Sequence, residues 1–83
     1  MKIKLLIRNK DEVSGPQLTK IIERPYLPPK ELVYSIEGII DEAYVDGYYD
    51  QIPKNEDYDI EIYLHTDDND GLKKLLLAGW VPN

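Results

Sequence analysis

The chain has 83 residues, no cysteine and a formal net charge of −6 at pH 7. Its length predicts one small domain over residues 1–83, and the lack of cysteine excludes a disulfide framework and a thiolate metal site. No run approaches the ~18 apolar residues of a membrane span, and the N-terminal residues lack a signal-peptide pattern. We therefore expect a cytoplasmic protein with no membrane partner.

The first predicted element is a strand over residues 2–8, where apolar side chains recur at every second position. The second is a short helix over residues 15–23. Ser14 and Gln17 have the spacing of a helix-capping box, and the apolar residues that follow have helical spacing. Pro25 ends this helix.

Residues 25–29 include three prolines. This density excludes a helix interior and a central strand, and it favours a polyproline conformation. A ligand for an aromatic groove is one interpretation. A rigid connector that packs Tyr26 and Leu27 onto the core is the interpretation we favour, because short connections are the commoner case.

Residues 32–49 form the longest stretch with helical spacing, and we expect a long central helix here. Its buried stripe would be Leu32, Ile36, Ile39, Ile40 and Ala43. A pair of strands is the alternative, because the stretch is rich in β-branched residues and tyrosine. In that case Asp46 and Gly47 would form the hairpin turn, and Gly38 would no longer weaken a helix interior.

A second strand is predicted over residues 58–64, with one apolar and one acidic face. A C-terminal helix follows, with Asp68 or Asp70 at its start and Gly79 at its end. We expect an α+β fold with a two- or three-stranded antiparallel sheet, in the order β-α-α-β-α. The alternative order is β-α-β-β-α.

No catalytic or cofactor motif is present, so we expect a protein that is not an enzyme and holds no cofactor or metal. Residues 66–71 resemble a calcium loop, but Leu77 occupies the position of its closing acid, and helix capping is the better interpretation. His65, the only histidine, lies beside two aspartates. We expect it to be a solvent-facing residue at a strand end rather than a general base.

The acidic charge is concentrated in the middle of the chain. Residues 1–30 carry seven bases and three acids, whereas residues 31–72 carry thirteen acids and only Lys54 as a base. Binding to a phosphate backbone needs clustered lysine and arginine. We therefore expect no direct contact with nucleic acid, and a basic protein surface as the partner.

The exposed side of the central helix is the predicted binding face, because tyrosine is enriched in binding hot spots. Its residues are Tyr34, Glu37, Gly38, Asp41, Val45 and Tyr48. The leading hypothesis is a non-enzymatic acidic binding protein. In composition the chain resembles small acidic phage and mobile-element products that inhibit host proteins, some as mimics of DNA. The alternative is a structural homodimer with this tyrosine-rich face at the self-interface.

Overall fold

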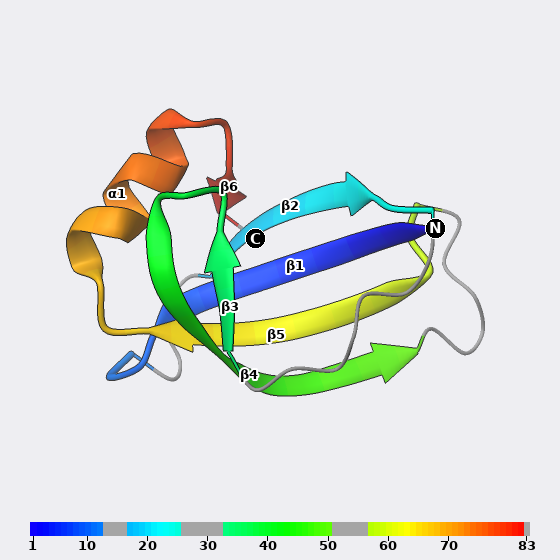
Figure 1. Cartoon of the computed structure of the whole chain (residues 1–83), viewed down its shortest axis with the longest axis horizontal. Helices are drawn as coiled ribbons and strands as arrows, with labels where there is room; N and C mark the ends of the chain where they lie inside the picture. The colour runs from blue at the N-terminus through cyan, green and yellow to red at the C-terminus, as the bar shows by residue number, and fades with distance from the viewer. Residues whose placement is uncertain (13–16, 26–32, 51–56, 83) are drawn as a thin grey trace.

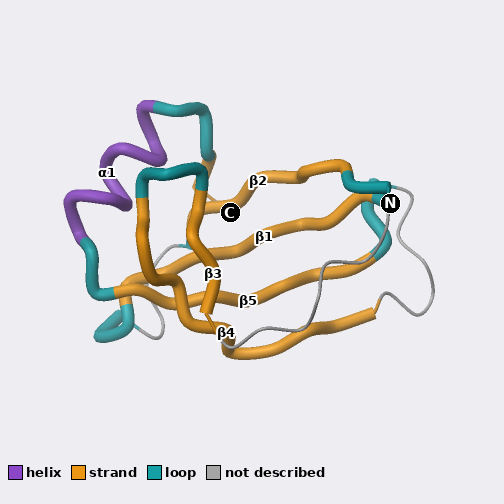
Figure 2. The backbone as a smooth tube through the Cα atoms, in the orientation of Figure 1, coloured by secondary structure: helices purple, strands orange, loops and turns teal. Residues whose placement is uncertain are grey.

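The computed structural model describes residues 1–12, 17–25, 33–50 and 57–82 (Figure 1). They form six strands and one helix, in the order β1 (Lys2–Asn9), β2 (Leu18–Glu23), β3 (Val33–Ile36), β4 (Ile40–Asp50), β5 (Ile60–Thr66), α1 (Asn69–Leu77) and β6 (Val81–Pro82). All the strands belong to one sheet with the order β3-β4-β5-β1-β2-β6 (Figure 2). The fold is thus a mixed sheet with a single short helix, and the predicted α+β arrangement with a long central helix is wrong.

The strand expected at residues 2–8 is confirmed as β1, and the strand expected near 58–64 is confirmed as β5, which begins at Ile60. These two strands are neighbours, as expected, but they run parallel. Parallel neighbours need a long connection between them. Here the connection contains β2, β3 and β4, which add to the two sides of the β1–β5 pair.

The helix expected over residues 15–23 is wrong, because its described part is strand β2. β2 pairs with β1 over six residues, from Leu18 opposite Ile7 to Glu23 opposite Lys2. The ladder with β1 satisfies backbone groups that a short isolated helix would expose at its ends. Three of the residues in the proposed capping box, 14–16, lie outside the described residues, as do residues 26–29 of the connector expected at 25–29.

The long helix over 32–49 is also wrong. Ile36 and Ile40 are paired across a tight turn in which Glu37 and Gly38 have φ values of 52° and 70°. The amide of Ile39 donates to the carbonyl of Ile36 at 2.8 Å, which closes the turn. Two positive φ values in succession are typical of a type I′ hairpin, in which glycine is favoured. Gly38 therefore marks the turn rather than a weak point in a helix.

The alternative strand-pair interpretation misplaced this turn. Asp46 and Gly47 lie inside β4, where the pairing with β5 shifts register between Val45 and Gly47. Such a bulge adds one residue to a strand and increases its local twist. Leu32 lies outside the described residues.

The C-terminal helix is present as α1. The side chain of Asp68 accepts a hydrogen bond from the amide of Gly71 at 2.8 Å, so Asp68 is the N-cap, as the helix-capping interpretation predicted. Gly79, with a φ of 103°, follows the end of the helix. None of the helices in the described part of the chain is long and apolar enough to cross a membrane.

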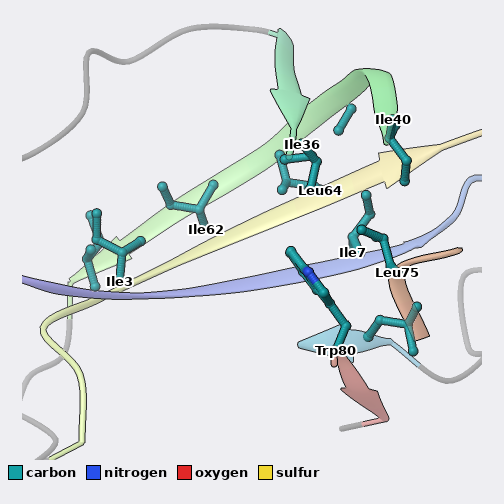
Figure 3. Close-up of a cluster of buried hydrophobic side chains, with 11 residues drawn as sticks. Ile3, Ile7, Ile36, Ile40, Ile62, Leu64, Leu75 and Trp80 are labelled. Carbon is teal, nitrogen blue, oxygen red and sulfur yellow. The ribbon is translucent and has the colours of Figure 1, made fainter. Parts of the chain in front are cut away.

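The core lies on one face of the sheet, beneath α1 and the β3–β4 hairpin (Figures 1 and 3). Trp80 enters it from the segment after the helix and is 2% exposed. The buried cluster consists of Ile3, Ile7, Leu18, Ile36, Ile40, Ala43, Ile60, Ile62, Leu64, Leu75 and Trp80. The opposite face of the sheet, which we call the outer face, carries the side chains of the alternate residues.

Candidate interaction surface

The six residues of the predicted binding face do not form one surface. Tyr34, Val45 and Tyr48 are partly buried against the core cluster, and the hydroxyls of Tyr34 and Tyr48 are 2.5 Å apart. Glu37 and Gly38 form the hairpin turn, and Asp41 is an exposed residue of β4. Because the predicted face depended on a helix, the sheet divides its residues between the core side, the turn and the solvent.

Glu37 does have a defined role, which is to attach the turn to the sheet. One of its carboxylate oxygens lies 2.5 Å from Nζ of Lys20 in β2, and the other accepts a hydrogen bond from Nε1 of Trp80 at 3.2 Å. The hydrogen bond from Lys20 is the main cause of a lowered pKa for the Glu37 carboxyl. These contacts offset the cost of a positive φ at a residue other than glycine.

We predict that Glu37→Gln lowers the free energy of unfolding at neutral pH by up to about 1 kcal/mol, the range of exposed ion pairs. Because the folded pKa is lowered from 4.5, the stabilisation is complete above that value and is lost as pH falls through the folded pKa. Urea unfolding from neutral pH down to about pH 2 should therefore show a smaller acid-induced loss in the variant. Glu12→Gln, at an exposed site outside this network, should show no such difference.

The outer face is the surface on which aromatic and charged side chains gather. Strand pairing places them in rows across β4, β5 and β1. One row is Tyr44, His65 and Arg8. The next is Gly47, Tyr63 and Leu6. The third is Tyr49, Glu61 and Lys4. Since residues paired directly across a sheet point to the same side, each row is a set of neighbours.

Two aromatic pairs join β4 to β5 on this face. The rings of Tyr44 and His65 are stacked with centroids 5.5 Å apart, and those of Tyr49 and Tyr63 meet edge to face at 5.2 Å. Tyr44 is 39% exposed and Tyr49 54%. Large tyrosine surfaces are thus held in place by neighbouring rings and still reach the solvent.

In both β4 and β5 a glutamate precedes a tyrosine by two residues, so the two side chains lie on the same side of the sheet. The hydroxyl of Tyr44 donates to Glu42 at 2.7 Å, and that of Tyr63 donates to Glu61 at 3.0 Å. The hydrogen bond to Glu42 raises the pKa of the Tyr44 phenol, whereas burial, followed by the bond to Glu61, raises the pKa of Tyr63. Both phenols are therefore neutral at physiological pH.

Asp46, at the bulge, connects three strands. One of its oxygens lies 2.7 Å from Nδ1 of His65, and the other lies 3.4 Å from the guanidinium of Arg8. The histidine is thus held by a carboxylate and a stacked ring, which is a different environment from the simple solvent-facing position expected. A carboxylate can orient an imidazole for acid–base chemistry, but in the described part of the chain the side-chain contacts of His65 are with Asp46 and the ring of Tyr44, and neither is a serine, threonine or cysteine.

Charge is divided across the sheet. On the outer face, β4 and β5 carry the carboxylates of Glu42, Asp46 and Glu61, whereas the neighbouring strand β1 carries Lys4 and Arg8 in the same rows. The β4–β5 half of this face is therefore its acidic half. No group of three or more histidines or acids suited to a metal ion was found among the described residues.

Sequence reasoning missed this surface, although a signal for it was present. The polar side of the strand predicted over residues 58–64 includes Tyr63, and His65 follows at the end of this strand, so aromatic side chains accompany the acidic ones. Comparisons of the chain with family models, with curated proteins and with solved structures found no match. The case for a function therefore rests on the side chains of the outer face.

Proposed function

We propose that this chain is a non-enzymatic binding protein that engages a lysine- and arginine-rich surface of a protein partner through the β4–β5 half of its outer face. The observation that carries the proposal is the pairing of tyrosines with carboxylates on this face: the exposed Tyr44 with Glu42, and the half-buried Tyr63 with Glu61. Tyrosine gives a large contact area at a low entropic cost. The carboxylates favour encounter with a basic partner.

The charge division supports a protein partner rather than nucleic acid. Phosphates would be repelled by the acidic half of the face, where the tyrosines lie. The proposed setting is the cytoplasm, because a chain without cysteine suits a reducing compartment. An inhibitor that occupies the basic site of another protein, in the manner of the phage products that it resembles in composition, is the biological role we propose.

The test of this proposal replaces tyrosines without changing the charge. A synthetic peptide rich in lysine and arginine is titrated into the protein, and amide shifts are followed by NMR. We expect the shifts to centre on β4 and β5, and Tyr44→Ser combined with Tyr49→Ser should weaken binding by about tenfold. The matched control is Leu76→Ser with Leu77→Ser, which removes two exposed apolar side chains from α1 and should leave binding unchanged.

A second comparison tests whether binding depends on the carboxylates of this face or only on the net charge of the protein. Glu42→Gln with Glu61→Gln changes the charge by the same amount as Asp11→Asn with Asp70→Asn, two residues that lie outside β4 and β5. We expect only the first pair to weaken binding markedly. Equal weakening by both pairs would contradict the proposal. So would sedimentation showing a dimer that the double tyrosine variant dissociates, because the face would then be a self-interface.

A further inference from the structure

We infer that the outer face binds one arginine side chain of its partner in the corner between the rings of Tyr49 and Tyr63. This inference rests on the proposed function and specifies the group that the face recognises. The corner belongs to an open hollow of about 480 Å³. Its lining residues are Arg8, Gln17, Asp46, Tyr49, Glu61 and Tyr63.

The geometry of the two rings favours a planar cation. Their planes are at 90°. A guanidinium that stacks on one ring would therefore also contact the second ring with its edge. Cations are attracted to the faces of aromatic rings, and arginine does so more often than lysine because its planar group also stacks. The two carboxylates of the hollow, Asp46 and Glu61, add acceptors suited to a guanidinium.

The hollow already contains one contact between a guanidinium and a carboxylate. Arg8 lines the same hollow, and its guanidinium contacts Asp46 at 3.4 Å while donating to the carbonyls of Asn9 and Lys10. These bonds hold the Arg8 side chain at one side of the hollow. The contact with Arg8 also neutralises part of the charge of the Asp46 carboxylate. The incoming arginine is therefore expected to bind on the side of Glu61 and the two tyrosines.

Gly47 makes the corner possible. A Cβ atom at this position would lie 2.8 Å from the ring of Tyr49 and 2.9 Å from its hydroxyl. The Tyr49 ring therefore lies close over the bare backbone of the bulge. Because the crowded atoms are at the far end of a flexible side chain, Gly47→Ala should move the ring and leave the fold intact.

The experiment uses three blocked peptides that differ at one residue: Gly-Gly-Arg-Gly-Gly, the same peptide with lysine, and the same peptide with uncharged citrulline. We expect the arginine peptide to shift the NMR signals of Gly47, Tyr49 and Tyr63. The lysine peptide should bind about threefold more weakly, and the citrulline peptide should cause no shift. Gly47→Ala should reduce the response to arginine, whereas Leu77→Ala, on the exposed side of α1, should not.

The outcomes separate this inference from the function on which it rests. If the arginine peptide causes no shift at the corner while the basic peptide still binds β4 and β5, the inference is wrong and the proposed function stands. Equal binding of arginine and lysine, or an unchanged response in Gly47→Ala, also overturns the inference. If neither the arginine peptide nor the basic peptide binds, both proposals fall.

Discussion

Trp80→Ala is expected to lower the free energy of unfolding by about 3–5 kcal/mol, the usual cost of replacing a buried tryptophan with alanine. Trp80 is 2% exposed and belongs to the core cluster (Figure 3). Its indole also donates to Glu37, so the substitution leaves a cavity and removes one of the two contacts that attach the hairpin turn, while the contact with Lys20 remains. Urea or thermal unfolding monitored by circular dichroism measures the loss.

Two variants make this result interpretable. Trp80→Phe keeps most of the ring volume but loses the donor, so its effect should be smaller than that of Trp80→Ala. Leu77→Ala, at a helix residue that is 89% exposed, should stay within about 0.5 kcal/mol of the wild type. If Trp80→Ala lowered the free energy of unfolding by less than about 1 kcal/mol, the burial of this side chain would not be a main source of stability.

Gly71→Ala is expected to destabilise the protein by about 1–3 kcal/mol, the usual cost of overpacking. In most helix interiors, replacing glycine with alanine has the opposite effect. At Gly71, a Cβ atom would lie 2.5 Å from a carboxylate oxygen of Asp68 and 2.7 Å from Cγ1 of Ile40. It would therefore disturb the N-cap and push the first turn of α1 away from β4.

The sign of the effect is the informative part of this measurement. Lys73→Ala, at an exposed position of the same helix, is a control for the propensity of alanine and should have an effect near zero. Equilibrium unfolding in urea compares the two variants. An increase in stability for Gly71→Ala would contradict the close contact of Gly71 with Asp68 and Ile40.

Much of the core could be predicted even where the secondary structure could not. Ile36, Ile40 and Ala43 were expected on the buried side of a helix, and all three are buried in the sheet. A separation of four residues is ambiguous. It would place Ile36 and Ile40 on the same side of a helix, and it also pairs them across the hairpin turn that the structure contains. Apolar periodicity identified these residues as core, but it did not distinguish four residues of helix from a tight turn.

The sheet itself depends on contacts between residues that are far apart in the chain. Leu18 to Glu23 has apolar spacing compatible with a helix, and it forms a strand because β1 provides a partner. The bulge at Asp46 likewise depends on the register with β5. Strand propensity is sensitive to such neighbours, and they cannot be read from a local window of sequence.

The candidate site also depends on contacts between distant residues, and for this reason it could not be predicted from the sequence. Tyr44, Tyr49 and Tyr63 share a face because β4 lies beside β5, and Asp46 reaches His65 and Arg8 because the bulge turns it to the same side. The prediction that carboxylates and tyrosines together form a binding surface remains a proposal. Its location has moved from a single predicted helix to two paired strands.

The position of β1 has a consequence for how the chain folds. β1 lies at the centre of the sheet beside β5, although more than half of the sequence separates the two strands. Contacts between such distant residues raise the contact order, and proteins rich in them fold in milliseconds to seconds rather than microseconds. During synthesis β1 leaves the ribosome well before β5, so its parallel partner in the sheet is absent until most of this sequence has been made.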